Sequence, residues 1–327
     1  MSDAPRAWVL NLDAEHELEA SCRYAPTLHL RAIVARERQR LIGTLVGPRD
    51  VVLTEEDFRH DTEATRRARG LPGIAWSPTP RALAHLTAAG ARPVSAPSVS
   101  VLRTVNARPF AALVREPLQR ESFSKHVVAH IDAVLAQLAR PARDGWLVRR
   151  TFGAAGRGRR RLHSGAPSSA ERAWIDASLR LGPLVIEPWV TVTCEYTRSA
   201  WVHTNGEVTI SAPCFQQTTA HGSWTSTERA GAGDVSRDDD ELLEGAVAAA
   251  GAALAASGYF GAFGIDAYRH RALDGSARSV LNPLSEINAR FTMDWATAMA
   301  ANPATGVALD RLAELTERSR LDAPRAT

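Results

Sequence analysis

A carboxylate, a carboxamide and a guanidinium lie two residues apart in a predicted strand near the end of the chain: Glu286, Asn288 and Arg290. Because side chains alternate along a strand, Glu286 and Asn288 point to one face and Ile287 to the other. Asp266 belongs to the neighbouring predicted strand. Two carboxylates and an amide oxygen form an all-oxygen set, which suits Mg²⁺ bridging phosphates better than zinc or copper. The alternative is a solvated strand end whose acids face water.

Three glycines separate two predicted strands, 146–150 and 159–163: Gly153, Gly156 and Gly158. Glycine allows backbone N–H groups to turn toward one point and lets a phosphate approach closely. Arg149 and Arg150 lie at the mouth of this turn and would supply the counter-charge. The stretch is neither a Walker loop nor a dinucleotide fingerprint, because no Gly-Lys-Ser/Thr follows and both flanks are strands. It predicts a phosphate-binding loop, with a flexible basic hairpin as the alternative.

An arginine cluster among the same residues permits a third interpretation: Arg157, Arg159, Arg160 and Arg161. Such a basic patch is typical of proteins that bind RNA. No aromatic residues are interleaved with these arginines, although single-stranded nucleic acid is bound largely by stacking on aromatic rings. The net charge of +3 is also small for 327 residues. RNA binding is therefore the less favoured alternative.

The predicted strand 184–190 ends in Glu-Pro-Trp-Val, and a further acid follows at Glu195. Proline is confined to the edges or bends of sheets, so Pro188 predicts an edge strand or a bend. Free backbone groups on an edge strand can pair with the rim of a purine base, and a nearby carboxylate can hold ribose hydroxyls. Taken alone, however, the pattern favours an edge strand with a structural role only.

Composition limits the classes of protein that these motifs can belong to. The chain is long enough, at 327 residues, for two or three domains, and its 45% of apolar residues is typical of a globular protein. Lys125 is its only lysine, so a phosphate site normally built on lysine must use arginine. The three cysteines form no close pair, and no apolar run approaches the ~20 residues that span a bilayer. The N-terminus lacks the apolar run of a signal peptide. We therefore expect a soluble cytoplasmic protein without membrane or nucleic-acid partners.

The elements that must position these residues form an α/β part followed by an α+β part. Residues 1–100 alternate predicted strands with helices, which indicates a parallel-sheet α/β domain, and the Pro/Ser-rich 91–100 predicts a linker. A polar loop over 216–234 is of the kind that often carries function. The predicted strands are 7–12, 51–53, 146–150, 159–163, 184–190, 258–269 and 278–290, with a hairpin over 201–211. The predicted helices are 30–45, 79–90, 106–116, 124–139, 168–179 and 240–256.

The N-terminal run NLDAEHELEA, residues 11–20, places four acids in a short span. An acid-rich first helical turn, favoured by the helix dipole, explains this run. A site for a substrate amine is the alternative. We interpret His16, and His221 in the polar loop, as surface residues, and of the two His221 is the better candidate for a functional role.

Taken together and in this order, these pieces resemble the ATP-grasp superfamily over residues 100–300. The resemblance is carried by the glycine-rich loop after a basic strand end (LVRRTFGAAGRG), the hinge EPWV, the later acid Glu195 and the terminal set that begins with Asp266. The run E-I-N-A-R is its most specific part. The resemblance implies a two-subdomain ATP-grasp fold over 101–327, with a lid at 141–190, after an N-terminal α/β domain at 1–100.

The resemblance also implies how ATP would be held. The backbone from Glu187 through Trp189 to Val190 would contact the adenine, and Glu195 the ribose. Arg149 occupies the place where the family usually has a phosphate-binding lysine. The loop that closes over the phosphates would contain Gly153, Gly156 and Gly158.

One or two Mg²⁺ ions would be ligated by three residues of the terminal set: Asp266, Glu286 and Asn288. Arg290 would face the transferred phosphoryl group. The family usually brings a second lysine from the helix before the lid, and here the chain offers Arg103 or Arg108 instead. Arginine keeps the charge and binds phosphate in bidentate fashion, so activity is compatible with both replacements. The two replacements also leave open a catalytically silent, ATP-binding regulatory module.

The activity implied is that of an ADP-forming carboxylate–amine ligase. Phosphoryl transfer from ATP would activate a carboxylate as an acyl-phosphate, and an amine would then displace phosphate. The expected partners are a small-molecule carboxylate and a small-molecule amine, with amino acids or peptides as candidates. A homo-oligomer is compatible with these expectations.

Overall fold

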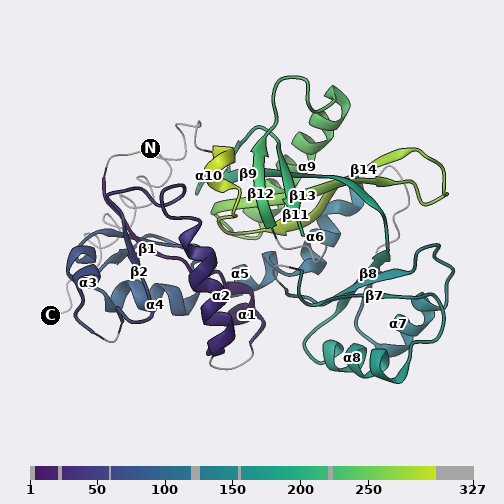
Figure 1. Cartoon of the computed structure of the whole chain (residues 1–327), viewed down its shortest axis with the longest axis horizontal. Helices are drawn as coiled ribbons and strands as arrows, with labels where there is room; N and C mark the ends of the chain where they lie inside the picture. Colours follow the sequence, from purple (N-terminus) through teal and green to yellow (C-terminus); the bar gives the residue numbers. More distant parts are fainter. Residues whose placement is uncertain are drawn as a thin grey trace.

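The structure, a computed structural model, describes residues 4–20, 24–58, 60–118, 126–153, 156–219 and 224–299. Within these ranges the chain forms one parallel and two antiparallel sheets with helices packed around them (Figure 1). The predicted class, α/β followed by α+β, is confirmed. No helix in the described ranges is long and apolar enough to cross a membrane.

The N-terminal sheet is parallel, as predicted for residues 1–100. The order of its strands is β2-β1-β3-β4. Its strands are β1 Ala7–Val9, β2 Val51–Leu53, β3 Pro72–Ala75 and β4 Arg92–Pro93. Its helices are α1 Ala14–Glu19, α2 Leu28–Gln39, α3 Glu63–Ala68 and α4 Pro80–Ala88. Strand β3 was not predicted, and β4 lies in the stretch predicted as a linker, because neither short segment has an alternating pattern of its own. Both are strands through pairing with their neighbours.

The second sheet is antiparallel and has the order β5-β8-β6-β7; three of its strands come from the residues predicted as a lid, 141–190, and β5 precedes them. Its strands are β5 His126–Val128, β6 Trp146–Arg149, β7 Arg159–Leu162 and β8 Leu184–Pro188. Helices α7 Ile131–Leu138 and α8 Ser169–Leu179 pack against it around a separate apolar core. A capping box between Ser168 and Glu171 begins α8, which was predicted at this place.

Two predictions for this sheet are wrong. The helix predicted over 124–139 begins only at Ile131, because residues 126–128 pair with β8 as strand β5. The strand β8 is not an edge strand, since it lies between β5 and β6. Pro188 is tolerated because it is the last residue of β8.

The third and largest sheet is antiparallel, with the order β12-β11-β9-β13-β14 and β10 paired to β9. Its strands are β9 Val192–Val202, β10 Val208–Ile210, β11 Cys214–Thr218, β12 Trp224–Arg229, β13 Gly261–Arg271 and β14 Ser279–Asn288. The remaining helices are α5 Val99–Val105, α6 Arg108–Arg115, the 3-10 turn η1 Glu116–Leu118, α9 Arg237–Ala256 and α10 Trp295–Met299.

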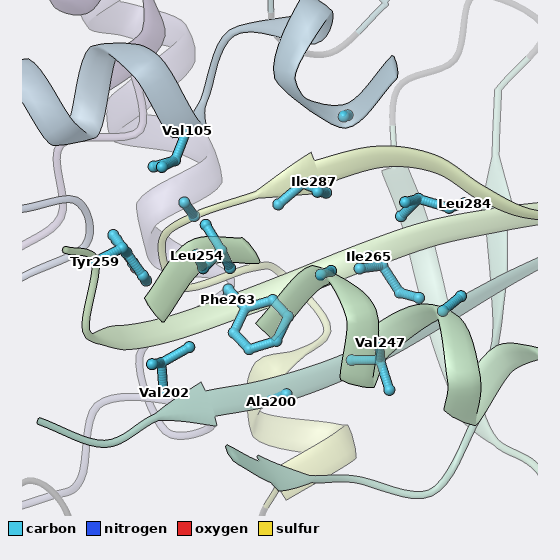
Figure 2. Packing of buried hydrophobic residues seen from close by; sticks show 14 of the residues in the cluster. Val105, Ala200, Val202, Val247, Leu254, Tyr259, Phe263, Ile265, Leu284 and Ile287 are labelled. Atoms are coloured by element: carbon cyan, nitrogen blue, oxygen red, sulfur yellow. The ribbon is translucent and has the colours of Figure 1, made fainter. Parts of the chain in front are cut away.

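One face of this sheet is covered by α5, α6 and α9 around a core of apolar side chains. Figure 2 shows Phe263 and Ile265 of β13 beside Val247 and Leu254 of α9. The predicted hairpin over 201–211 is confirmed, with Gly206 at a positive φ of 87° in the Asn-Gly turn. The predicted strands 258–269 and 278–290 pair with each other as β13 and β14. The predicted loop over 216–234 is wrong in part, because β11 and β12 pair within it.

The other face of the sheet meets the N-terminal domain through an aromatic seam. Phe291 packs against Trp8 of β1 at a ring distance of 5.4 Å and against Trp295 of α10 at 5.1 Å. The backbone N–H of Phe291 also donates a hydrogen bond to the carbonyl of Trp76, at 3.1 Å. This seam fixes the residue before it, Arg290, at the joint between the two sheets.

Candidate functional site

A cavity of about 970 Å³ lies where the three sheets meet. It contains most of the residues predicted for the site, although they come from separate elements. Those that line it are Arg149, Gly153, Gly156, Glu187, Trp189, Val190, Glu195, Asp266, Glu286, Asn288 and Arg290. Arg103 and Gly158 are not among the residues that line it.

The two acidic residues predicted for a metal are direct partners across two neighbouring strands. Asp266 of β13 is opposite Glu286 of β14, so their side chains leave the sheet on the same face. Asn288 donates from Nδ2 to a carboxylate oxygen of Asp266 at 3.0 Å, and its Oδ1 accepts from Arg290 at 3.0 Å. A shift in the register of the two strands follows Asp266, as is common beside functional sites.

The two carboxylates have different electrostatic surroundings. Burial and the charge of Glu286 raise the pKa of Asp266 to about 8. Burial acts in the same direction on Glu286, but the guanidiniums of Arg108 and Arg149 outweigh it and lower the pKa of Glu286. Glu286 accepts a hydrogen bond from Arg108 Nε at 3.1 Å, whereas Asp266 has no ion-pair partner among the described residues. Asp266 is therefore the carboxylate that a bound cation would compensate.

Removing the charge of Asp266 is expected to stabilise the protein at high pH. The folded-state pKa is raised from 3.8 to about 8, so this carboxyl contributes stability at low pH that is lost as the pH rises through about 8. Asp266→Asn should therefore raise the midpoint of thermal unfolding at about pH 9, with a chelator present, and should raise it much less at about pH 5.

Differential scanning calorimetry at the two pH values measures this difference. Glu207→Gln, which changes an exposed acid in the β9–β10 turn, is the matched control and should shift neither midpoint. Equal shifts for Asp266→Asn at both pH values would show that ionisation of Asp266 is not costly.

No three His, Cys, Asp or Glu side chains in the described ranges group closely enough to hold a metal by themselves. The two carboxylates and the amide oxygen of Asn288 are nevertheless hard oxygen donors on one strand pair. Together with the missing counter-charge at Asp266, they fit a divalent cation that takes further oxygens from a bound ligand.

Of the two arginines that the sequence offered for a phosphate, Arg108 lines the cavity and Arg103 does not. Arg103 is exposed and donates to the carbonyl of Ala20 at 2.9 Å, away from the cavity. Arg108 is 6% exposed and joins Glu286 to the glycine-rich loop, through a bond from Nη2 to the Gly153 carbonyl at 2.8 Å. The reason lies in helix geometry, because Arg103 is on the outer side of α5 whereas Arg108 begins the buried face of α6.

The glycine-rich loop is closed by a hydrogen bond from the Arg150 N–H to the Gly158 carbonyl at 2.8 Å. Gly156 and Gly158 have positive φ angles of 76° and 71°, which explains glycine at both positions. Gly153 is required for space, since a Cβ there would lie 2.5 Å from the Arg157 carbonyl oxygen. Residues 154–155, between them, lie outside the described ranges.

Arg149 and Glu187 form a buried ion pair, which the sequence did not predict. The Glu187 carboxylate is 1% exposed and is bonded to Arg149 and, at 3.3 Å, to Arg115. Burial acts to raise the pKa of Glu187, but the two guanidiniums outweigh it and hold the pKa at about 2. Arg149 lines the cavity with its charge partly neutralised by Glu187.

The hinge residues leave the sheet at the end of β8. The Trp189 N–H donates to the Gly145 carbonyl at 2.9 Å, and the guanidinium of Arg161 lies 4.9 Å from the centre of the Trp189 ring. Trp189 and Val190 then form one wall of the cavity. Glu195 of β9 lines the adjoining wall and accepts from the Thr218 hydroxyl at 2.7 Å.

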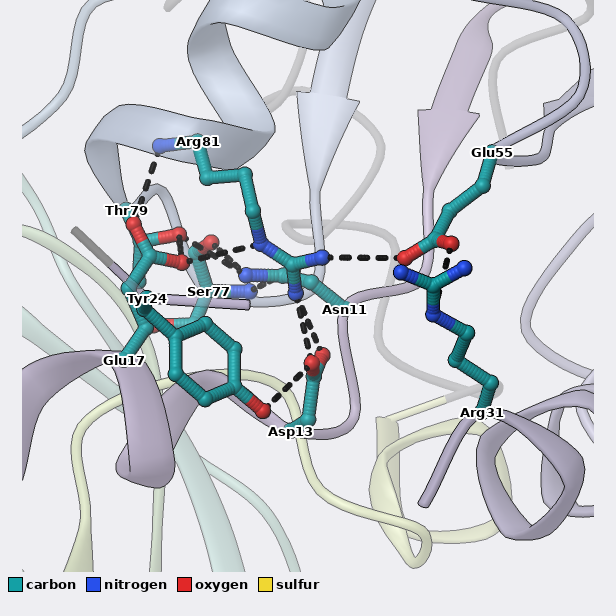
Figure 3. Close-up of polar contacts among 9 residues, drawn as sticks. All are labelled: Asn11, Asp13, Glu17, Tyr24, Arg31, Glu55, Ser77, Thr79 and Arg81. Carbon is teal, nitrogen blue, oxygen red and sulfur yellow. Dashed lines mark hydrogen bonds and ion pairs between the residues drawn. The ribbon is translucent and has the colours of Figure 1, made fainter. Parts of the chain in front are cut away.

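The acidic run near the N-terminus is more than a solvated helix start. Arg81, the second residue of α4, is clamped by the carboxylates of Asp13 at 2.6 Å, Glu17 at 3.5 Å and Glu55 at 3.3 Å (Figure 3). Glu55 also pairs with Arg31 of α2 at 3.2 Å. This network fixes α1 and α2 to the C-terminal ends of the parallel strands, where both helices border the cavity.

Three residues complete the site and were not assigned from the sequence: Glu15, His16 and Asp294. Glu15 is buried and forms an ion pair with Arg290. His16 was interpreted as a surface residue, yet it lines the cavity, and its Nε2 is covered with no hydrogen-bond partner in the described chain. Asp294 accepts from Trp224 Nε1 at 3.0 Å, and burial raises its pKa. His221 lies outside the described residues.

No protein-family model matches the chain, and no curated protein matches it in sequence. Solved structures do match. The biotin carboxylase–β,γ-ATP complex from Campylobacter jejuni is 12% identical, with a TM-score of 0.57 over 95% of this chain and 70% of that one. D-alanyl-alanine synthetase A from Vibrio cholerae is 13% identical, with a TM-score of 0.51 over 99% and 100%. These two likenesses show that the chain shares the fold of these two proteins.

Proposed function

We propose that the protein is an ATP-dependent ligase that activates a carboxylate as an acyl-phosphate and joins it to an amine. The observation that carries this proposal is the pair Asp266 and Glu286, which share one face of the sheet beside three guanidiniums in a single cavity. Those guanidiniums belong to Arg108, Arg149 and Arg290. Such a site combines a place for a cation with positive groups for a triphosphate, and phosphoryl transfer depends largely on both.

The nucleotide would lie with its base at the hinge. The backbone of Trp189 and Val190 would contact the adenine, and Glu195 would accept from the ribose hydroxyls. Arg108 and Arg149 would hold the phosphates under the glycine-rich loop. This assignment is supported by the positions of these residues around one cavity and by the β,γ-ATP named for the Campylobacter jejuni structure.

Asp266, Glu286 and Asn288 would hold Mg²⁺. When bound, this ion would neutralise charge on the β- and γ-phosphoryl groups. In the first step a substrate carboxylate oxygen attacks the γ-phosphorus and ADP leaves. In the second step the amine attacks the acyl carbon, phosphate leaves and the nitrogen loses a proton. Arg290, held by Glu15 and Asn288, would face the transferred phosphoryl group.

The experiment that tests the reaction follows oxygen. The protein is mixed with ATP, Mg²⁺, amines and a panel of amino acids labelled with ¹⁸O in their carboxylates. ADP formation with ¹⁸O in the released phosphate would support an acyl-phosphate, because the carboxylate oxygen stays on phosphorus when the amine attacks. Label-free phosphate would contradict this route.

A second candidate is a silent ATP-binding module. The observation that favours it is that Arg149, in the place of the usual lysine, is bonded to Glu187. Calorimetry that detects binding of ATP, with no ADP formed with any pair in the panel, would favour this candidate over the ligase.

Gly153→Ala is expected to weaken binding of a non-hydrolysable ATP analogue on the order of tenfold. The new Cβ would lie 2.5 Å from the Arg157 carbonyl and 2.9 Å from Arg108 Nη1, so the loop must move away from Arg108. Calorimetric titration measures the change. Gly245→Ala is the control, because a Cβ there meets nothing within 4 Å on a helix. If Gly153→Ala leaves the affinity for the analogue unchanged, the glycine-rich loop does not contact the phosphates as proposed.

A further inference from the structure

The cavity has a second, apolar wall that the proposed chemistry does not use. It is made by side chains of the N-terminal domain and of the segment after β14: Leu12, Leu30, Ile33, Val34, Trp76 and Met293. Leu30, Ile33 and Val34 are three and four residues apart, so they share one face of α2. None of the apolar cores in the described chain includes Leu30 or Ile33, and both remain partly exposed to the cavity.

This apolar wall lies directly beside the reactive end of the cavity. The Arg290 guanidinium is 5.8 Å from the centre of the Trp76 ring, and Met293 follows Arg290 by three residues. A substrate whose carboxylate meets Arg290 would therefore extend its remaining atoms along this wall. Apolar surface in a concave site is typical of the part of a pocket that binds a ligand's hydrocarbon.

The charged residues on the same helix do not favour a charged side chain. Arg36 and Glu37 also line the cavity, but they pair with each other at 2.9 Å. Glu37 is bonded to Arg40 as well, at 3.0 Å. A charged substrate side chain at this wall would be desolvated against Leu30 and Ile33, which is costly.

We propose that the carboxylate substrate carries an apolar side chain, which binds against Leu30, Ile33, Trp76 and Met293. This inference rests on the proposed function, because it takes Arg290 as the place of the reacting carboxylate. It adds the class of substrate: a carboxylic acid, with or without an α-amino group, whose hydrocarbon part is about the size of leucine or larger.

Calorimetric binding of two matched pairs of probes tests the proposal, with and without a non-hydrolysable ATP analogue and Mg²⁺. The pairs are alanine with leucine, and propanoate with 4-methylpentanoate, which differ by the same hydrocarbon. Burial of each added carbon should tighten binding by about fourfold, so the larger member of at least one pair should bind more than about tenfold tighter. Equal affinities within both pairs would overturn the proposal.

Two variants locate the preference. Ile33→Asp should abolish the difference in affinity between the larger and the smaller probe of a pair. Ile33→Ala, which carries less risk to folding, should reduce that difference severalfold. Leu28→Asp is the matched control, because Leu28 is on the same helix but is 83% exposed and outside the cavity lining. A preference that survives Ile33→Asp would overturn the assignment to this wall.

The outcomes also separate this inference from the proposed function. If the unchanged protein shows no preference for the larger probe in either pair but still forms ¹⁸O-labelled phosphate, the role of the apolar wall is refuted and the proposed ligase reaction is supported. A preference that is present and depends on Ile33, without any ADP formation, would support the wall and refute the ligase.

Discussion

Glu286→Gln should lower the rate of ADP formation on the order of a thousandfold while the protein stays folded. The substitution keeps the size of the side chain and removes a charge that serves two groups. Glu286 is the partner of Asp266 across β13 and β14, and it is the anion that Arg108 bonds at 3.1 Å. Loss of this charge therefore weakens the proposed cation site. It also removes the anion that holds Arg108, whose guanidinium bonds the Gly153 carbonyl of the glycine-rich loop. The rate is measured as ADP released per enzyme under saturating ATP and Mg²⁺.

The control for this prediction is Glu241→Gln. Glu241 is an exposed acid of α9, and among the described residues it pairs with Arg237 alone, on the same helix, at 2.8 Å. It should leave the rate unchanged. Circular dichroism of both variants checks the fold, and Mg²⁺ titration of the rate shows whether Glu286→Gln acts through the cation. A variant that turns over at the original rate would remove the proposed mechanism.

The second large effect is on stability and comes from the buried group of Arg115, Arg149 and Glu187. Glu187→Gln is expected to lower the free energy of unfolding by about 3–5 kcal/mol, because it removes the buried anion that both Arg115 and Arg149 bind. Urea unfolding followed by fluorescence measures the loss. Adding Arg115→Met to Glu187→Gln should recover part of it, because this removes one of the two guanidiniums that bind the Glu187 carboxylate.

The same group predicts how stability depends on pH. The pKa of Glu187 is lowered from 4.5 to about 2 in the folded protein, so its contribution is complete above about pH 4.5 and is lost as the pH falls toward 2. The difference corresponds to a contribution on the order of 3 kcal/mol. Glu187→Gln should flatten the stability curve over this acidic window. A curve as steep as that of the unchanged protein would show that other carboxyls cause the loss.

The strand pair of the site could be predicted because its pattern is local. Alternation around Ile287 put Glu286 and Asn288 on one face, and Asp266 was predicted on the neighbouring strand, where it is opposite Glu286. The choice of Arg108 over Arg103 could also be predicted from the sequence, by the spacing of the residues in α6. Arg108 and Arg115 are seven residues apart with alanines at the intervening core positions, and this spacing puts both arginines on the buried face of α6.

Other features could not be read from one sequence. Glu15 and Arg290 are 275 positions apart, and no local pattern links them. Strand β5 lies in a stretch whose apolar residues also match helical spacing, and only its pairing with β8 makes it a strand. The polar residues of β11 and β12 gave no alternating pattern, although Trp224 reaches Asp294 from there.

The aromatic seam and the apolar wall of α2 differ in how freely they can mutate, which bears on how the proposed ligase could change its substrate during evolution. Trp76 belongs both to the seam and to the cavity, so its replacement would disturb the packing that holds the sheets together. Leu30 and Ile33 line the same cavity but belong to none of the apolar cores formed by the described residues. Mutations there alter the ligand's surroundings at little cost in stability. A change to a new carboxylate substrate of the proposed ligase would therefore begin with mutations on α2, while the aromatic seam stays constant.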